Sequence, residues 1–170
     1  IGLVLAMMAC ITHGTTMVPV ERYSPVPVMN AISVEKCTAV HGVPTMFIAM
    51  LEHAQFNNFD FSSLRTGIMA GSPCPIEVMK KVIDKMNMRE IVIVFGQTEA
   101  SPGCTMTTTS DSIDKRVNTV GRAFPGVECK IIDPESGEEL PINTPGEFCA
   151  RGYNIMKGYY KMPEATAQAI

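Results

Sequence analysis

An aromatic ring, a glycine, a hydroxyl and a carboxylate lie close together in residues 95–102. This stretch directly follows the apolar run 91–94, which predicts a buried strand. Ligands of open α/β sheets bind beyond the carboxyl ends of strands. The ring of Phe95 suits a purine, the Thr98 hydroxyl can donate to a phosphate oxygen, and the Glu99 carboxylate can hold Mg²⁺. These types indicate a nucleotide site, although a plain strand-to-loop turn beside a helix cap fits the same spacing.

Further motifs accompany this stretch in a fixed order. They are His41 to Phe47 upstream, Ala70-Gly71-Ser72-Pro73 after an apparent strand, and two downstream segments at 146–152 and 156–160. Together they resemble the adenylate-forming (AMP-binding) superfamily, and the resemblance covers essentially the whole chain. That group contains acyl- and aryl-CoA synthetases, adenylation domains of nonribosomal peptide synthetases, and beetle luciferases. The sequences at 43–47 and 146–152 look most like those of fatty acyl-CoA synthetases, particularly the medium-chain branch.

The resemblance implies a role for each candidate site residue. Those expected to bind the nucleotide are Gly71, Ser72, Pro73, Phe95, Gly96, Gln97 and Thr98. Phe95 would stack on adenine, and the loop at 71–73 would line the opposite side of the base and ribose. Thr98 would contact the α-phosphate and Glu99 would hold the magnesium that bridges ATP oxygens, so these two are the catalytic candidates.

Two positions depart from the family pattern. Phe95 stands where the family usually has tyrosine, and Ala70 replaces the first of two glycines. Stacking needs only the ring, so we expect phenylalanine at this position to bind the base nearly as well as tyrosine, with the loss of one hydroxyl contact. The Ala70 methyl is expected to narrow the acyl pocket, because this loop also borders the acyl chain.

The reaction that the resemblance implies has two steps. A carboxylic acid attacks the α-phosphate of ATP to give an acyl-adenylate and pyrophosphate, and the thiol of coenzyme A then displaces AMP. The protein must orient reactants and stabilise phosphate charge, which explains why no Ser-His-Asp or Cys-His constellation is evident. Two alternatives stay open: transfer of the acyl group to a carrier-protein thiol, and a non-catalytic fragment that binds nucleotide or acyl groups.

The chain is shorter than the family pattern. It has 170 residues, whereas family members run to several hundred. The resemblance implies a Gly/Ser/Thr-rich phosphate loop upstream, and a ribose-binding Thr-Gly-Asp motif, a hinge and a small C-terminal domain with a catalytic lysine downstream. We therefore expect an internal fragment of a larger N-terminal domain that is inactive by itself.

Composition limits the class of protein. Hydrophobic residues make up 46% and charged residues 18%, which indicates a folded globular chain. A net charge of −3 without a basic stripe argues against nucleic acid as a partner. The six cysteines form no C-x-x-C pair, so we expect free thiols in a reducing compartment and a cytoplasmic location. The apolar run at 1–12 is shorter than the roughly 20 residues that a membrane-spanning helix needs, so we expect no transmembrane segment.

Helix and strand patterns alternate over the first part of the chain. Helices are predicted at 1–13, 25–36, 44–54 and 75–86, and strands at 16–20, 38–40, 66–70 and 90–95. This alternation predicts an α/β fold with a parallel sheet flanked by helices over residues 1–115. Short strands at 119–122, 128–132 and 147–151, separated by Pro/Gly turns, predict a β-rich, antiparallel and barrel-like part over 116–170. Strand formers at 104–109, a short helix at 111–115 and a short helix at the end complete the pattern.

Several residues have a second interpretation. Ser72 can cap the helix that follows it. His41 can face an acyl or thiol tunnel, but a lone histidine is more often a satisfied core residue. Arg122 and the stretch 152–160 are interpreted as structural.

Overall fold

The computed structural model describes residues 2–170. The helical segments are η1 (Gly2–Met8), α1 (Ala9–His13), α2 (Pro25–Glu35), α3 (Pro44–Leu51), η2 (Phe56–Asn58), α4 (Ile76–Lys85), η3 (Thr98–Ala100), α5 (Ile113–Asn118) and α6 (Pro163–Ala169). The strands are β1 (Ala39–Gly42), β2 (Thr66–Ala70), β3 (Glu90–Phe95), β4 (Thr105–Met106), β5 (Arg122–Ala123), β6 (Val127–Ile132) and β7 (Glu147–Gly152).

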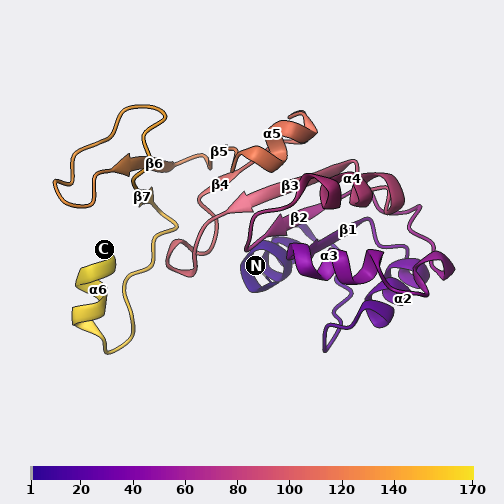
Figure 1. Cartoon of the computed structure of the whole chain (residues 1–170). Helices are drawn as coiled ribbons and strands as arrows, with labels where there is room; N and C mark the ends of the chain where they lie inside the picture. Colours follow the sequence, from indigo (N-terminus) through magenta and orange to yellow (C-terminus); the bar gives the residue numbers. More distant parts are fainter. Residues whose placement is uncertain (1) are drawn as a thin grey trace.

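The main sheet has the order β1-β2-β3-β4-β5 (Figure 1). Strands β1, β2 and β3 run parallel, whereas β4 and β5 join in antiparallel pairing. The connections between the parallel strands contain α3 and α4, as parallel neighbours require. The predicted α/β fold, a parallel sheet with helices followed by short antiparallel strands, is confirmed.

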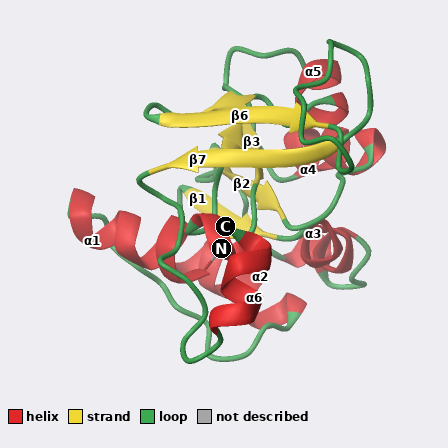
Figure 2. Cartoon of the chain, turned by 90° about the vertical axis from the view of Figure 1, so that its left-hand side faces the viewer, coloured by secondary structure: helices red, strands yellow, loops and turns green. Residues whose placement is uncertain are grey.

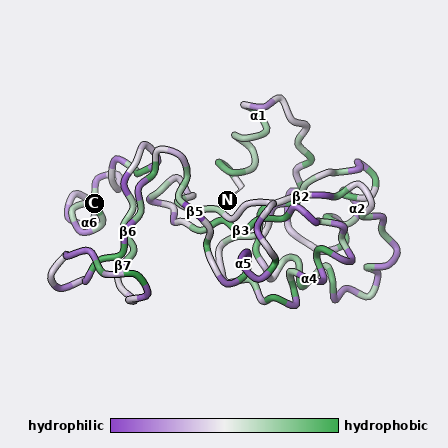
Figure 3. Tube along the Cα trace, turned by 90° about the horizontal axis from the view of Figure 1, so that it is seen from above, coloured by the Kyte–Doolittle hydropathy of each residue, from purple (hydrophilic) through white to green (hydrophobic). Residues whose placement is uncertain are grey.

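The core lies between this sheet and the helices α2, α3 and α4. Its fully buried side chains are rich in methionine, with Met29, Met50, Met69, Met79, Met86 and Met88 at 0% or 1% exposure. Phe47 and Ile91 complete the contact between the helices and the sheet. Seen from above, α1 lies on one side of the sheet and α4 and α5 on the other (Figure 3). The central strands are thus covered by a dense apolar layer on the face against which α2, α3 and α4 pack.

The last part of the chain forms a separate antiparallel pair, β6 and β7, followed by the short helix α6 (Figure 2). Strand β6 pairs with β7 from Val127↔Gly152 to Ile132↔Glu147. Strand β5, which follows residue 115, pairs with β4 in the main sheet. The division into parts at 1–115 and 116–170 stays a prediction.

Several predicted elements differ in detail from the structure. Residues 16–20 form no strand, and Pro19 within them has no N–H to donate to a neighbouring strand. The strand predicted at 104–109 is limited to β4, and the helix predicted at 111–115 is α5, which begins after Ser112. The Ser112 hydroxyl caps α5 by accepting from the Lys115 N–H at 3.3 Å. Ser72 is not a helix cap, because α4 begins after Pro75.

Candidate nucleotide site

Two loops meet at the carboxyl edge of the main sheet. Strands β2 and β3 are parallel neighbours, with Ala70 opposite Val94 in the register. The loop at 71–73 and the stretch that begins at Phe95 therefore leave the sheet side by side, at the ends toward which the β2 and β3 arrows point in Figure 1. The predicted adjacency of these loops is confirmed. Their position is the one where open α/β sheets bind ligands.

The candidate residues of these loops face solvent. The exposed ones are Gly71, Ser72, Pro73, Phe95, Gly96, Gln97 and Thr98, and Glu99 is half-buried. Gly71 has φ 91°, in the left-handed region that favours glycine. Polar groups at 72, 97 and 98 are thus open to a ligand, and none of them supports the core.

Gly96 is required by the chain itself. A Cβ atom built there would lie 2.0 Å from the Pro102 carbonyl oxygen and 2.8 Å from the Gly103 Cα. The backbone after β3 folds back on itself at this point, and the Cys104 N–H donates to the Phe95 carbonyl at 2.9 Å. The chain therefore needs a residue without a Cβ at position 96, because its own backbone approaches closely there.

This geometry predicts that Gly96→Ala lowers the free energy of unfolding by about 1–3 kcal/mol, the usual cost of forcing extra volume into a packed site. Urea unfolding followed by circular dichroism measures the change. Gly2→Ala is the matched control, because nothing lies within 4 Å of a Cβ at that position. Equal stability of both variants would show that the turn after β3 adapts freely.

Phe95 packs against the second part of the chain. Its ring centroid lies 5.0 Å from that of Phe148 in β7, with the ring planes at 87°. Phe95 nevertheless keeps 39% exposure. The contact orients the ring while part of its surface stays exposed.

Glu99 is held from a segment sixty positions away in the sequence. The Tyr159 hydroxyl donates to the Glu99 Oε1 at 2.5 Å. This hydrogen bond lowers the pKa of the Glu99 carboxyl and raises the pKa of Tyr159. The Met156 N–H also donates to the Glu99 carbonyl at 2.7 Å. Both the side chain and the backbone of Glu99 are therefore fixed by the segment after β7.

Asn154 also joins the segment after β7 to the stretch that follows Glu99. It is buried, and its Nδ2 donates to the carbonyl oxygens of Ala100 at 3.0 Å and Gly103 at 2.9 Å. The interpretation of 152–160 as structural missed the Tyr159 contact with a candidate site residue. The only signal in the sequence was the order of the motifs, since no periodic pattern links positions 99 and 159.

The donor set suits Mg²⁺ better than a softer metal. Within residues 2–170 no group of three or more His, Cys, Asp or Glu side chains gathers to hold a metal ion. Glu99 and the neighbouring Thr98 offer hard oxygen atoms. Mg²⁺ is commonly bound by one or two protein carboxylates together with substrate phosphates, so the single Glu99 carboxylate is compatible with this ion.

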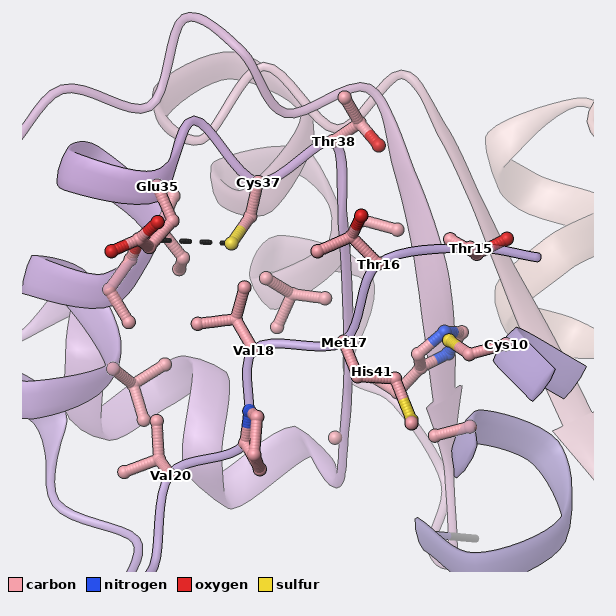
Figure 4. Close-up of a pocket in the computed structure, with 18 of the residues that line it drawn as sticks. Cys10, Thr15, Thr16, Met17, Val18, Val20, Glu35, Cys37, Thr38 and His41 are labelled. Atoms are coloured by element: carbon pink, nitrogen blue, oxygen red, sulfur yellow. Dashed lines mark hydrogen bonds between the residues drawn. The ribbon is translucent and has the colours of Figure 1, made fainter. Parts of the chain in front are cut away.

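A separate cavity of about 670 Å³ lies beside β1 (Figure 4). Segment 15–20, α2, α3 and His41 contribute to its wall, whereas the loops at 71–73 and 95–99 do not. The His41 Nδ1 is buried without a hydrogen-bond partner among the described residues, and burial lowers the pKa of the ring. His41 is therefore not a satisfied core histidine, and it faces a cavity distinct from the two loops.

None of the helices formed by residues 2–170 combines the length and the apolar character needed to cross a bilayer.

The fold is that of an α/β protein with a mixed, mostly parallel sheet, and the loops after β2 and β3 lie side by side at its carboxyl edge. The chain belongs to the family described as "AMP-binding enzyme", and the model of this family matches residues 1–160. The relatives it matches place it in the acyl-CoA synthetase branch.

One such relative is "Putative acyl-CoA synthetase YngI" of Bacillus subtilis (strain 168), which is 54% identical over 169 residues, 99% of this chain and 31% of the relative. Another is "Medium-chain acyl-CoA ligase ACSF2, mitochondrial" of Bos taurus, 39% identical over 174 residues, 100% of this chain and 28% of the relative. The solved structure of ATP-bound MatB from Rhodopseudomonas palustris matches with a TM-score of 0.81 and 25% identity, over 98% of this chain and 32% of that chain. The chain thus spans about a third of the length of the proteins it matches.

Proposed function

We propose that the chain supplies the nucleotide-binding loops of an ATP-dependent fatty acyl-CoA synthetase, an acid–thiol ligase. The enzyme activates a carboxylic acid as acyl-AMP and transfers the acyl group to coenzyme A. The observation that carries this proposal is the parallel β2–β3 pair, which brings the loop at 71–73 beside Phe95 and the candidate residues Thr98 and Glu99. The family, the acyl-CoA synthetases among its relatives and the ATP-bound structure with the same fold support it.

Each edge residue has a task in the proposed adenylation. Phe95 covers the adenine, and Gly71, Ser72 and Pro73 bound the other side of the base and the ribose. Gly96 and Gln97 form the turn that leads from the base to the phosphates. Thr98 donates to the α-phosphate oxygen, and this orients the phosphorus toward the incoming carboxylate.

Glu99 is the residue that would hold Mg²⁺. Bound there, the ion would neutralise negative charge on the ATP phosphates as pyrophosphate leaves. The Tyr159 hydroxyl donates to Oε1 of this carboxylate, which holds the carboxylate in place and lowers its pKa.

A medium-chain acid is the proposed substrate, because relatives such as the Bos taurus ligase are named for that class. The test is acid-dependent exchange of pyrophosphate into ATP by the full-length protein, with short-, medium- and long-chain acids. We expect exchange to be fastest with medium-chain acids and AMP release to require coenzyme A. Absence of exchange with every acid would refute the activity and favour a non-catalytic binding role.

The same assay separates the carrier-protein alternative. A phosphopantetheinylated carrier protein replaces coenzyme A as the acceptor, and we expect it to be the poorer one, since the matched relatives are named as CoA synthetases and ligases. The cytoplasmic location stays a prediction, which fractionation of cells can test. The name of the Bos taurus relative includes "mitochondrial", so the compartment differs within the family.

A further inference from the structure

We propose that Tyr159 is a positioning residue that fixes the Glu99 carboxylate for the cation of the adenylation step. This inference rests on the proposed function, because it needs Glu99 to be the metal-binding carboxylate. The Tyr159 hydroxyl lies 2.5 Å from Glu99 Oε1, and the Tyr159 side chain is exposed while Glu99 is half-buried. Thr98 beside them makes no side-chain hydrogen bond among residues 2–170.

The hydrogen bond divides the tasks of the two carboxylate oxygens. A phenol has one proton to donate, and here it goes to Oε1. Oε1 is thereby anchored, and the lone pairs of Oε2 remain for a cation. Side chains that donate to a metal-binding carboxylate set its orientation and improve the metal affinity in this way.

Tyr159 can act as an anchor because its own backbone is held. The Tyr159 N–H donates to the Thr166 Oγ1 at 2.9 Å, and that hydroxyl donates at 2.8 Å to the carbonyl of Met162, the residue that precedes α6. A Cβ at Gly158 would lie 2.7 Å from the Thr166 Cγ2, so the chain packs directly on α6 here.

The Glu99 end of the pair is held by the same segment. The Met156 N–H donates to the Glu99 carbonyl at 2.7 Å, and the Asn154 Nδ2 donates to the next carbonyl, that of Ala100, at 3.0 Å. Backbone and side chain of Glu99 thus have separate attachments to residues 154–159. Loss of the phenol hydroxyl would free the carboxylate while the backbone attachments remain.

The test is Tyr159→Phe in the full-length protein, with Tyr160→Phe as the matched control. Tyr160 is 85% exposed, and its ring contacts Lys161. Binding of Mn²⁺ in the presence of α,β-methylene ATP is measured by electron paramagnetic resonance, which needs no turnover. We expect Mn²⁺ to bind about tenfold more weakly to Tyr159→Phe, the lower end of the effect of such supporting residues. The Tyr160→Phe protein should bind Mn²⁺ as the wild type does.

Steady-state adenylation provides the second measurement. The Mg²⁺ concentration for half-maximal rate should rise in Tyr159→Phe, while kcat recovers at saturating Mg²⁺. Unchanged Mn²⁺ binding would overturn the inference. So would a lower melting temperature together with weaker metal-free binding of the ATP analogue, because that pair of results describes a purely structural tyrosine.

Glu99→Gln separates failure of this inference from failure of the proposed function. Weaker Mn²⁺ binding in Glu99→Gln with normal binding in Tyr159→Phe would refute the role of Tyr159 alone. Normal Mn²⁺ binding in both variants would remove the metal role of Glu99 and the inference with it.

Discussion

Replacement of Glu99 by glutamine is expected to slow adenylation by roughly a hundredfold or more, the effect of losing several kcal/mol of charge stabilisation. An amide is a much poorer ligand than a carboxylate for a hard cation such as Mg²⁺. The fold should change little, because Glu99 is half-buried and belongs to no ion pair among the described residues. The amide oxygen can still accept from the Tyr159 hydroxyl.

The two half-reactions of the full-length protein separate this effect from general damage. Adenylation is followed as pyrophosphate release, and thiolation is started from a supplied acyl-adenylate. Thiolation should be less affected, because pyrophosphate has already left. Glu135→Gln, a change of an exposed loop carboxylate, is the control. Equal slowing of both steps, or normal adenylation, would leave Glu99 as an ordinary loop carboxylate.

The second large effect concerns stability: Arg116→Met should lower the free energy of unfolding by about 3 kcal/mol, because buried acceptors lose a charged donor. Arg116 is only 6% exposed in α5. Its guanidinium donates to four carbonyl oxygens, those of Arg89, Ile91, Thr109 and Asp111, at 2.5–3.0 Å. It thereby ties the start of β3 to the loop before α5.

Arg65→Met is the matched control. Arg65 lies opposite the start of β3, and its side chain is 65% exposed while it pairs with Glu90 at 2.9 Å. Exposed pairs of this kind contribute about 0–1 kcal/mol. Urea unfolding monitored by circular dichroism compares the two variants. Similar losses in both would contradict the structural role assigned to Arg116.

The part of the fold that could be predicted from the sequence depends on local patterns. The apolar run before Phe95 and the amphipathic pattern of α4 fix β3 and its neighbour helix, and parallel pairing then places two loops at one edge. Residues 16–20 have the β-forming residues of a strand, but Pro19 removes a donor and no neighbour pairs with them in the structure. A local pattern predicts the tendency to extend and cannot predict the partner.

The contacts that could not be predicted are long-range and polar. The bond between Tyr159 and Glu99 and the attachments of Asn154 depend on how β6 and β7 sit beside the main sheet. Arg116 lies in a polar stretch where an arginine would ordinarily face water, so the neighbouring sequence does not predict that its side chain is buried. Such contacts follow from the tertiary arrangement.

The methionine-rich layer between the sheet and α2, α3 and α4 has a consequence for oxidative damage. Oxidation converts a thioether into a polar sulfoxide, which a close-packed apolar layer cannot accommodate. Met7, Met8, Met17 and Met162 are exposed to oxidants, whereas the sulfur atoms of the core are shielded while the fold persists. Oxidants therefore reach the core only when the chain opens, and each sulfoxide formed there makes the next opening easier. Oxidation of the exposed methionines leaves the packed core intact, whereas oxidation of the core methionines makes unfolding hard to reverse.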